Sequence, residues 1–150
     1  MVQQNELPDI FRNTVSTKKT NDLEDAAAAV IAGMSEQYPI WTLKELEKAD
    51  RLYQQILSLN NTEQNNLIRG DFYRIIHDIK GQGSTFGYPL MTTAGAYLCT
   101  LIKTHSVFSS NDLNKIADIL QFMHSVLEQK LSGDHKKGTT LLEHITKECS

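Results

Sequence analysis

Four residues in the middle of the chain have types and a spacing that could carry out group transfer. His77 is followed by Lys80, Gly81 and Ser84. If the segment is helical, residues three, four and seven positions apart lie on one side of it, within about 60° of His77. An imidazole can act as a nucleophile, and a neighbouring ammonium stabilises negative charge that develops during transfer. A phosphoryl group on His77 would add about two negative charges, which Lys80 could stabilise and to which Ser84 could donate a hydrogen bond.

Gly81 is the least expected member of this group. A glycine inside a helix is disfavoured by roughly 1 kcal/mol relative to alanine, and Gly81 falls on the outer face beside His77. We interpret it as clearance for another protein whose backbone must approach the imidazole. Gly83 falls on the apolar side of the same helix, where close packing of a second helix explains it.

The helix that positions His77 is predicted from about residue 62 to residue 86. With a step of about 100° per residue and His77 at zero, its apolar residues fall between about 160° and 260°. His77 is therefore expected to point away from the core. The apolar residues in question are Ile68, Phe72, Ile75, Ile76, Ile79 and Phe86.

Periodic apolar residues and short turns predict an all-α fold, an antiparallel up-down four-helix bundle. The four bundle helices are expected at about residues 42–59, 62–86, 89–104 and 110–131. No alternating strand pattern of useful length is present.

Two further helices are expected outside these four, one N-terminal and one short and C-terminal. The N-terminal helix is predicted at about 21–37 and is separated from the bundle by Pro39. Capping-box pairs suggest helix starts at Asn21, Thr42 and Thr140. Residues 1–40 are accordingly predicted to be an arm with an accessory helix, and residues 41–150 to be the bundle with its C-terminal helix.

Composition and charge exclude several classes of function. The chain has 150 residues, 40% of them apolar, and a net charge of −3, so a nucleic-acid surface or an anionic-membrane surface is not expected. No apolar run approaches the ~20 residues of a membrane span, and the N-terminus lacks a secretory signal pattern. The two cysteines, Cys99 and Cys149, suit a reducing compartment, and we expect a cytoplasmic protein.

The sequence offers no bound cofactor and no metal site. None of the five histidines belongs to an HExxH motif or another ligand pair at helical spacing. Gly81 and Gly83 lie inside a helical pattern rather than after a strand, so they do not form a phosphate-binding loop. Nothing indicates a nucleophilic triad.

The segment from Phe72 to Tyr88, FYRIIHDIKGQGSTFGY, resembles the signature of histidine-containing phosphotransfer (HPt) domains. Its ending, Thr-Phe-Gly-Tyr, is similar to the phosphotransfer domain of chemotaxis-type histidine kinases. The resemblance implies that His77 is the phospho-acceptor, Lys80 the phosphate-stabilising cation and Gly81 the clearance residue. Ser84 and Gly87 would be supporting positions of the motif.

Such a domain is a carrier, not an independent enzyme, and has no ATP-binding site of its own. The resemblance implies partners of two kinds, namely receiver domains of response regulators and a hybrid or chemotaxis-type histidine kinase. Mg²⁺ would belong to the receiver domain. We expect a monomer whose partner surface surrounds His77 and includes Tyr73, Arg74, Gly81, Gly87 and Tyr88. Packing or capping is the other interpretation of Tyr88, and a solvated surface position that of Arg74.

Two alternatives remain open. Asp78 is similar to the acidic neighbour of the histidine in the dimerisation and phosphotransfer domain of sensor kinases, but that family usually has a proline where this chain has Gln82. A dimer in light scattering would favour this alternative. The other is a helical adaptor without a signalling role, in which His77 is incidental.

Overall fold

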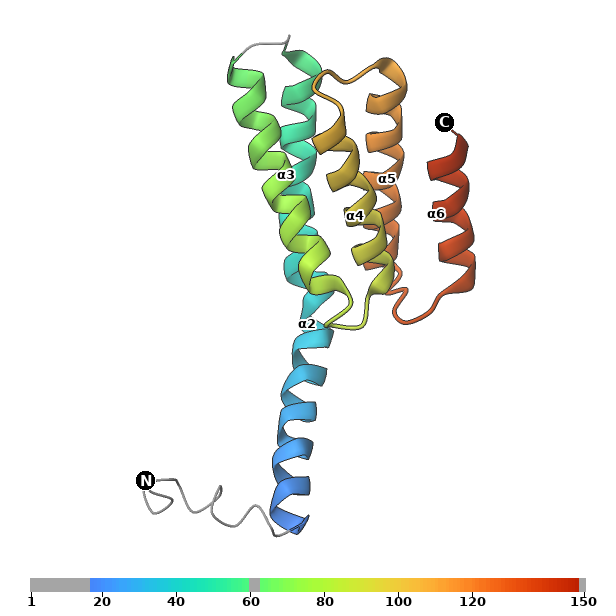
Figure 1. The fold of residues 1–150 in the computed structure, drawn as a ribbon. Helices are drawn as coiled ribbons and strands as arrows, with labels where there is room; N and C mark the ends of the chain where they lie inside the picture. Colours follow the sequence, from blue (N-terminus) through green and yellow to red (C-terminus); the bar gives the residue numbers. More distant parts are fainter. Residues whose placement is uncertain (1–16, 60–62, 149–150) are drawn as a thin grey trace. The chain divides into compact units, whose positions relative to one another are not determined.

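The computed structural model describes residues 17–59 and 63–148, and every regular element among them is an α-helix (Figure 1). The prediction of an all-α fold is confirmed. The helices are α2 (Thr17–Ser58), α3 (Glu63–Gly83), α4 (Pro89–Thr104), α5 (Ser110–Glu128) and α6 (Lys136–Glu148). The expectation of an N-terminal arm falls largely on residues 1–16, which lie outside the described residues.

The chain divides into two compact units that meet between Glu36 and Gln37. In the N-terminal unit, the described residues belong to the first part of α2, and nearly all of those with a described side chain are exposed. They include the large apolar residues Leu23, Val30, Ile31 and Met34.

Helix α2 is continuous through Pro39, so the predicted break at this proline is wrong. A proline inside a helix removes one hydrogen bond and crowds the preceding turn. Tertiary packing offsets that cost here, because Tyr38 and Leu46 on either side of Pro39 are fully buried. Thr42 is consequently a buried residue within α2 and not the N-cap of a new helix.

The second unit is a bundle formed by residues 37–58 of α2 and by α3, α4 and α5, with neighbouring helices antiparallel (Figure 1). Helix α3 packs on α4, and α4 on α5. Two side chains of α2 bond to α5. Tyr53 Oη donates to Leu113 O at 2.7 Å, and His124 Nε2 lies 2.6 Å from Asp50 Oδ2. The largest fully buried side chains are Tyr38, Leu46, Phe72, Ile76, Met91, Leu98, Ile116, Ile119 and Met123.

Helix α6 packs against α5 and α4 and begins earlier than predicted. The expected cap at Thr140 is wrong, because α6 starts at Lys136. The backbone N–H of Gly138 donates to His135 Nδ1 at 3.0 Å, so a histidine satisfies a free amide of the first turn. Helix α5 starts where predicted and is held there by a capping box between Ser109 and Asp112.

The turn from α3 to α4 brings the end of the His77 helix against the core. Helix α3 ends at Gly83, earlier than the predicted residue 86, and a turn follows. Gly87 has φ +89°, a left-handed conformation that favours glycine. Phe86 and Tyr88 of this turn pack against Tyr38, with ring centroids 5.8 and 5.2 Å from it.

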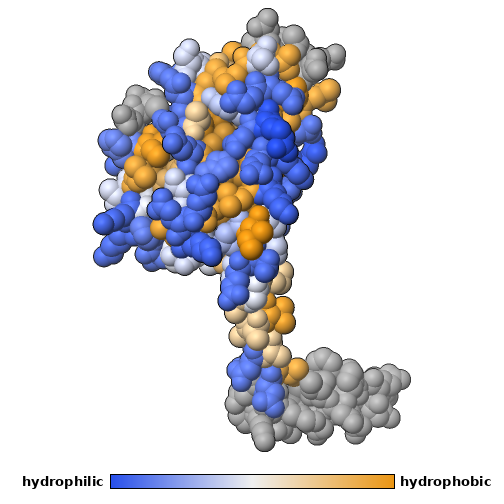
Figure 2. All heavy atoms as spheres, turned by 180° about the vertical axis from the view of Figure 1, so that it is seen from behind, coloured by the Kyte–Doolittle hydropathy of each residue, from blue (hydrophilic) through white to orange (hydrophobic). Residues whose placement is uncertain are grey.

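Figure 2 shows hydrophilic side chains over much of one face, with apolar side chains scattered among them. Among the described residues, no helix combines the length and the hydropathy that crossing a membrane would require.

Candidate functional site

His77 lies on the exposed side of α3, as predicted. Its side chain is 52% exposed, whereas Phe72, Ile76 and Ile79 of the same helix are buried. His77 Nδ1 is 3.8 Å from Asp78 Oδ1. The imidazole lies beside Tyr73, with ring centroids 5.8 Å apart and planes inclined by 32°. The acceptor predicted from the sequence is therefore accessible to a second molecule and backed by an aromatic ring.

Lys80 is placed by the close approach of α4. A Cβ atom on Gly95 would lie 2.8 Å from Lys80 Cβ and 3.3 Å from its Cα, so only glycine allows this spacing of the helices. The stem of Lys80 is half-buried at this contact. The Cα and Cβ atoms of Lys80 are thus held in place one helical turn from His77.

Lys103 of α4 supplies a second cation to the site, and it was not among the residues predicted from the sequence. Its Nζ lies 5.4 Å from the centroid of the Tyr73 ring, a cation–π contact. Burial raises the pKa of the Cys99 thiol, and the positive charges of Lys80 and Lys103 act on it in the opposite direction. Lys80 of α3 and Lys103 of α4 therefore both lie close enough to Cys99 for their charges to act on its thiol.

The two glycines near His77 differ in their surroundings. A Cβ atom on Gly83 would lie 2.5 Å from Thr92 Oγ1 and 2.8 Å from Tyr88 O, which confirms that close packing requires this glycine. A Cβ atom on Gly81 would meet nothing within 4 Å. The described part of the chain therefore gives no packing reason for Gly81, and its bare surface is open to an approaching molecule.

Ser84 does not continue the helix face of His77, because it lies in the turn after α3. Its backbone N–H donates to Thr92 Oγ1 at 2.8 Å, and Thr92 Oγ1 donates to Lys80 O at 2.9 Å. Thr92 thus satisfies the end of α3 from the neighbouring helix. Thr92 was missed from the sequence, since only the packing of α4 on α3 brings it there.

The other predicted partner residues fall into two groups. Tyr73 is half-buried and Arg74 is exposed, with Nη2 3.0 Å from Asp71 Oδ1. Tyr88 departs from the expectation of a partner contact, because it is only 5% exposed and stacks on Tyr38. Burial raises the pKa of Tyr88. Gly87 is exposed, and its carbonyl accepts from Gly133 N at 2.8 Å, so its described contacts are those of a turn.

Three of the remaining histidines make contacts that hold the fold. His124 pairs with Asp50, and His135 accepts a bond at the start of α6. His105 Nδ1 lies 3.1 Å from Leu101 O at the end of α4. No group of three or more potential metal-ligating side chains of His, Cys, Asp or Glu occurs among the described residues.

Comparisons of the chain with protein-family models, curated proteins and solved structures found no match. An accessible imidazole, with two lysines on its α4 side and a bare glycine one turn away, is suited to accepting a small anionic group from a second protein.

Proposed function

We propose that this protein is a cytoplasmic phosphocarrier of the HPt type, in which His77 carries a phosphoryl group between partner proteins. The observation that carries the proposal is the exposed imidazole of His77 beside Lys80 and the unpacked Gly81. The donor is an aspartyl phosphate of a receiver domain or a histidine kinase, and the acceptor is a receiver domain.

In the transfer step, an unprotonated imidazole nitrogen of His77 attacks phosphorus as the bond to the donor's carboxylate oxygen breaks. The carboxylate leaves with the electron pair, and the phosphoryl group becomes attached to nitrogen. The carboxylate of Asp78, whose Oδ1 lies 3.8 Å from Nδ1, is next to the imidazole on which positive charge develops in this step. Lys80 stabilises the negative charge of the phosphoryl oxygens, with Lys103 as a more distant cation. The reverse sequence returns the group to an aspartate.

The remaining catalytic parts belong to the partner in this proposal. The protein contributes an acceptor and cations held on two packed helices, α3 and α4, and the receiver domain contributes Mg²⁺ and the aspartate. The chain itself needs no nucleotide site, and it acts as a carrier without independent enzymatic activity.

His77→Gln tests the proposal directly. We expect that phosphoramidate or a phosphorylated receiver domain labels the wild-type chain in an acid-labile, base-stable form, and that this label is absent from the variant. Circular dichroism and the melting temperature should be unchanged, because the side chain is exposed. His105→Gln is the matched control and should retain the label. Labelling of His77→Gln at the wild-type level would refute the proposal.

One observation favours a second candidate, the dimerisation and phosphotransfer domain of a sensor kinase. The carboxylate of Asp78 is exposed and adjacent to the imidazole, as an acidic neighbour acting as base would be. Light scattering distinguishes the two candidates, since an HPt protein is expected to be a monomer at micromolar concentration.

A further inference from the structure

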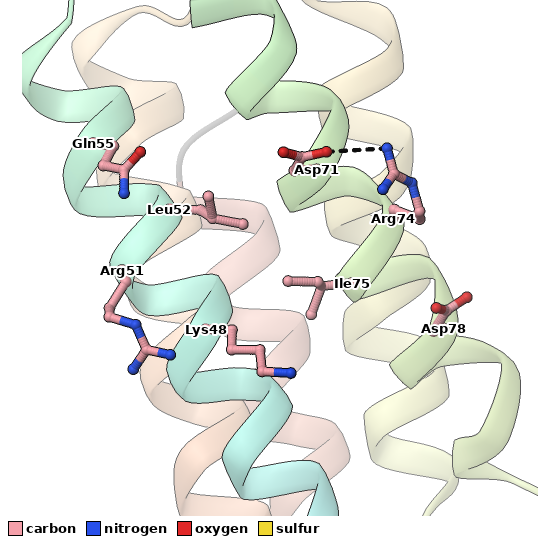
Figure 3. A pocket seen from close by; sticks show the side chains of 8 residues that line it. All are labelled: Lys48, Arg51, Leu52, Gln55, Asp71, Arg74, Ile75 and Asp78. Atoms are coloured by element: carbon pink, nitrogen blue, oxygen red, sulfur yellow. Dashed lines mark hydrogen bonds and ion pairs between the residues drawn. The ribbon is translucent and has the colours of Figure 1, made fainter.

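A groove lies between α2 and α3, on the side of α3 away from α4 (Figure 3). Its volume is about 430 Å³. The side chains that line it are Lys48, Arg51, Leu52 and Gln55 of α2 and Asp71, Arg74, Ile75 and Asp78 of α3. Leu52 and Ile75 are half-buried and form an apolar strip between charged residues of the two helices (Figure 3).

The charges of the groove leave one cation without a counter-charge. Lys48 Nζ lies 2.8 Å from Glu45 Oε2, and Arg74 pairs with Asp71. Arg51 is exposed and makes no ion pair or side-chain hydrogen bond within residues 17–59 and 63–148. A guanidinium presents several donors in a fixed plane and binds a carboxylate through two parallel hydrogen bonds. The groove is thus complementary to an acidic side chain.

The groove reaches the acceptor histidine through one residue. Asp78 lines the α3 wall, and its carboxylate lies 3.8 Å from His77 Nδ1. A protein that brings a reacting aspartate to His77 comes close to Asp78 at the same time. The part of its surface next to that aspartate then lies over the groove.

We propose that this groove receives a segment of the receiver domain that exchanges phosphate with His77. The segment presents a carboxylate to Arg51 and an aliphatic side chain to Leu52 and Ile75. The inference rests on the proposed function and adds the chemistry of the partner's docking segment. Charge complementarity to Arg51 supplies specificity and speeds encounter, while the apolar strip supplies contact area.

The test compares Arg51→Glu with Lys137→Glu, two reversals of charge at exposed positions on different helices. Each full-length protein is first labelled with phosphoramidate, which requires no docking. The receiver domains of the same organism are compared, and the one that removes the label fastest from the wild-type chain is chosen. Transfer from each labelled protein to this receiver domain is then measured. We expect equal labelling of all three proteins and, for Arg51→Glu alone, a KM raised about tenfold at nearly constant kcat.

Arg51→Lys and the salt dependence of KM separate the effect of the Arg51 charge from that of its planar pair of donors. Arg51→Lys should raise KM less than Arg51→Glu, because the charge remains and the planar donor pair is lost. Added salt should raise the KM of the wild type more than that of Arg51→Glu, since screening removes the same attraction. If Arg51→Glu has the KM of the wild type, the docking proposal is wrong. Labelling of His77 would still support the carrier function in that case. If the wild-type chain is not labelled, or no receiver domain removes the label, both proposals fail.

Discussion

The two sides of α3 differ in how they meet their neighbours. Toward α4 the contact is closed, because Gly83 and Gly95 let the helices approach until a single Cβ atom would overlap. Toward α2 the surface is hollowed into a groove with charged walls. His77 lies on the exposed part of α3 between these two sides.

In the proposed carrier, this difference separates two tasks, holding the chemical groups in place and receiving a partner protein. The closed side fixes the stem of Lys80 and the ring of Tyr73 beside the imidazole, so the chemical groups are in place before a partner arrives. The open side consists of exposed side chains, which can adjust to a second protein. If His77 is the acceptor proposed above, placing both sides on one helix would let the docking surface vary without disturbing it.

Gly83→Ala tests the closed side with the largest expected effect. The added methyl group would overlap Thr92 Oγ1 and, at 2.8 Å, the carbonyl oxygen of Tyr88. Since backbone cannot move away easily, we expect the free energy of unfolding to fall by about 2–3 kcal/mol. Urea denaturation followed by circular dichroism measures the change. An unaltered midpoint would show that α4 is not held against α3 as described.

Alkaline pH should loosen the same packed end of the bundle. Burial raises the pKa of Tyr38 to about 12, above its ordinary value of 10.0, and its hydroxyl donates to Ile79 O at 3.4 Å. The unfolded chain therefore loses the Tyr38 proton at lower pH than the folded one. The contribution of the protonated Tyr38 to stability is fully present below pH 10. It is lost as pH rises toward 12, and the free energy of unfolding then falls by about 2 kcal/mol. Denaturation at several pH values measures the slope, which Tyr38→Phe should reduce.

Neutralising each lysine should show how far the cations of the closed side contribute to chemistry. We expect Lys80→Met to slow single-turnover transfer about tenfold, because Lys80 is one helical turn from His77. Lys103→Met should slow it about threefold, since Lys103 reaches the site through the ring of Tyr73. Both proteins should melt close to the wild-type temperature. Equal rates for Lys80→Met and the wild type would remove Lys80 from the mechanism.

Gly81→Ala gives the smallest effect on stability and the sharpest contrast with Gly83. A Cβ atom meets nothing within 4 Å, so the substitution should raise the free energy of unfolding by up to about 1 kcal/mol. We expect transfer to a receiver domain to slow several-fold, because the methyl group occupies the clearance beside His77.

Gly70→Ala is the control for this prediction, since Gly70 is also in α3 with open space around it. It should raise stability without slowing transfer, because it lies about 10 Å along the helix from His77. Slower transfer in both variants would mean that the partner surface extends well beyond the acceptor.

Local patterns predicted the helices and the exposed position of His77 well where neighbouring residues decide the outcome. Helix α4 has its predicted bounds, since Pro89 begins it, and the apolar repeat of α3 places His77 outside the core. The break predicted at Pro39 was wrong because packing around Tyr38 keeps the helix continuous. The cap predicted at Thr140 was wrong because the bond from Gly138 to His135 holds an earlier helix start. Propensity alone does not contain such tertiary effects.

The supporting residues of the site could not be found in the same way. Thr92, Lys103 and Arg51 lie on helices other than that of His77, and each reaches the site or its groove only through packing. A weak signal exists for Lys103, which follows Gly95 and Cys99 at a spacing of four residues and so shares their side of α4. Nothing in the sequence distinguishes Arg51 from other exposed cations.

The bond from Ser84 to Thr92 has a consequence for motion at the end of α3. Amides in exposed turns ordinarily exchange with solvent deuterium within the shortest labelling times, and helix ends open locally. The Ser84 amide donates to a side chain that is itself bonded to Lys80 O. Its exchange should therefore be slow for a turn, and the last turn of α3 should resist fraying. The helix that carries His77 would then keep a defined length, so the position of the imidazole relative to α4 would vary little.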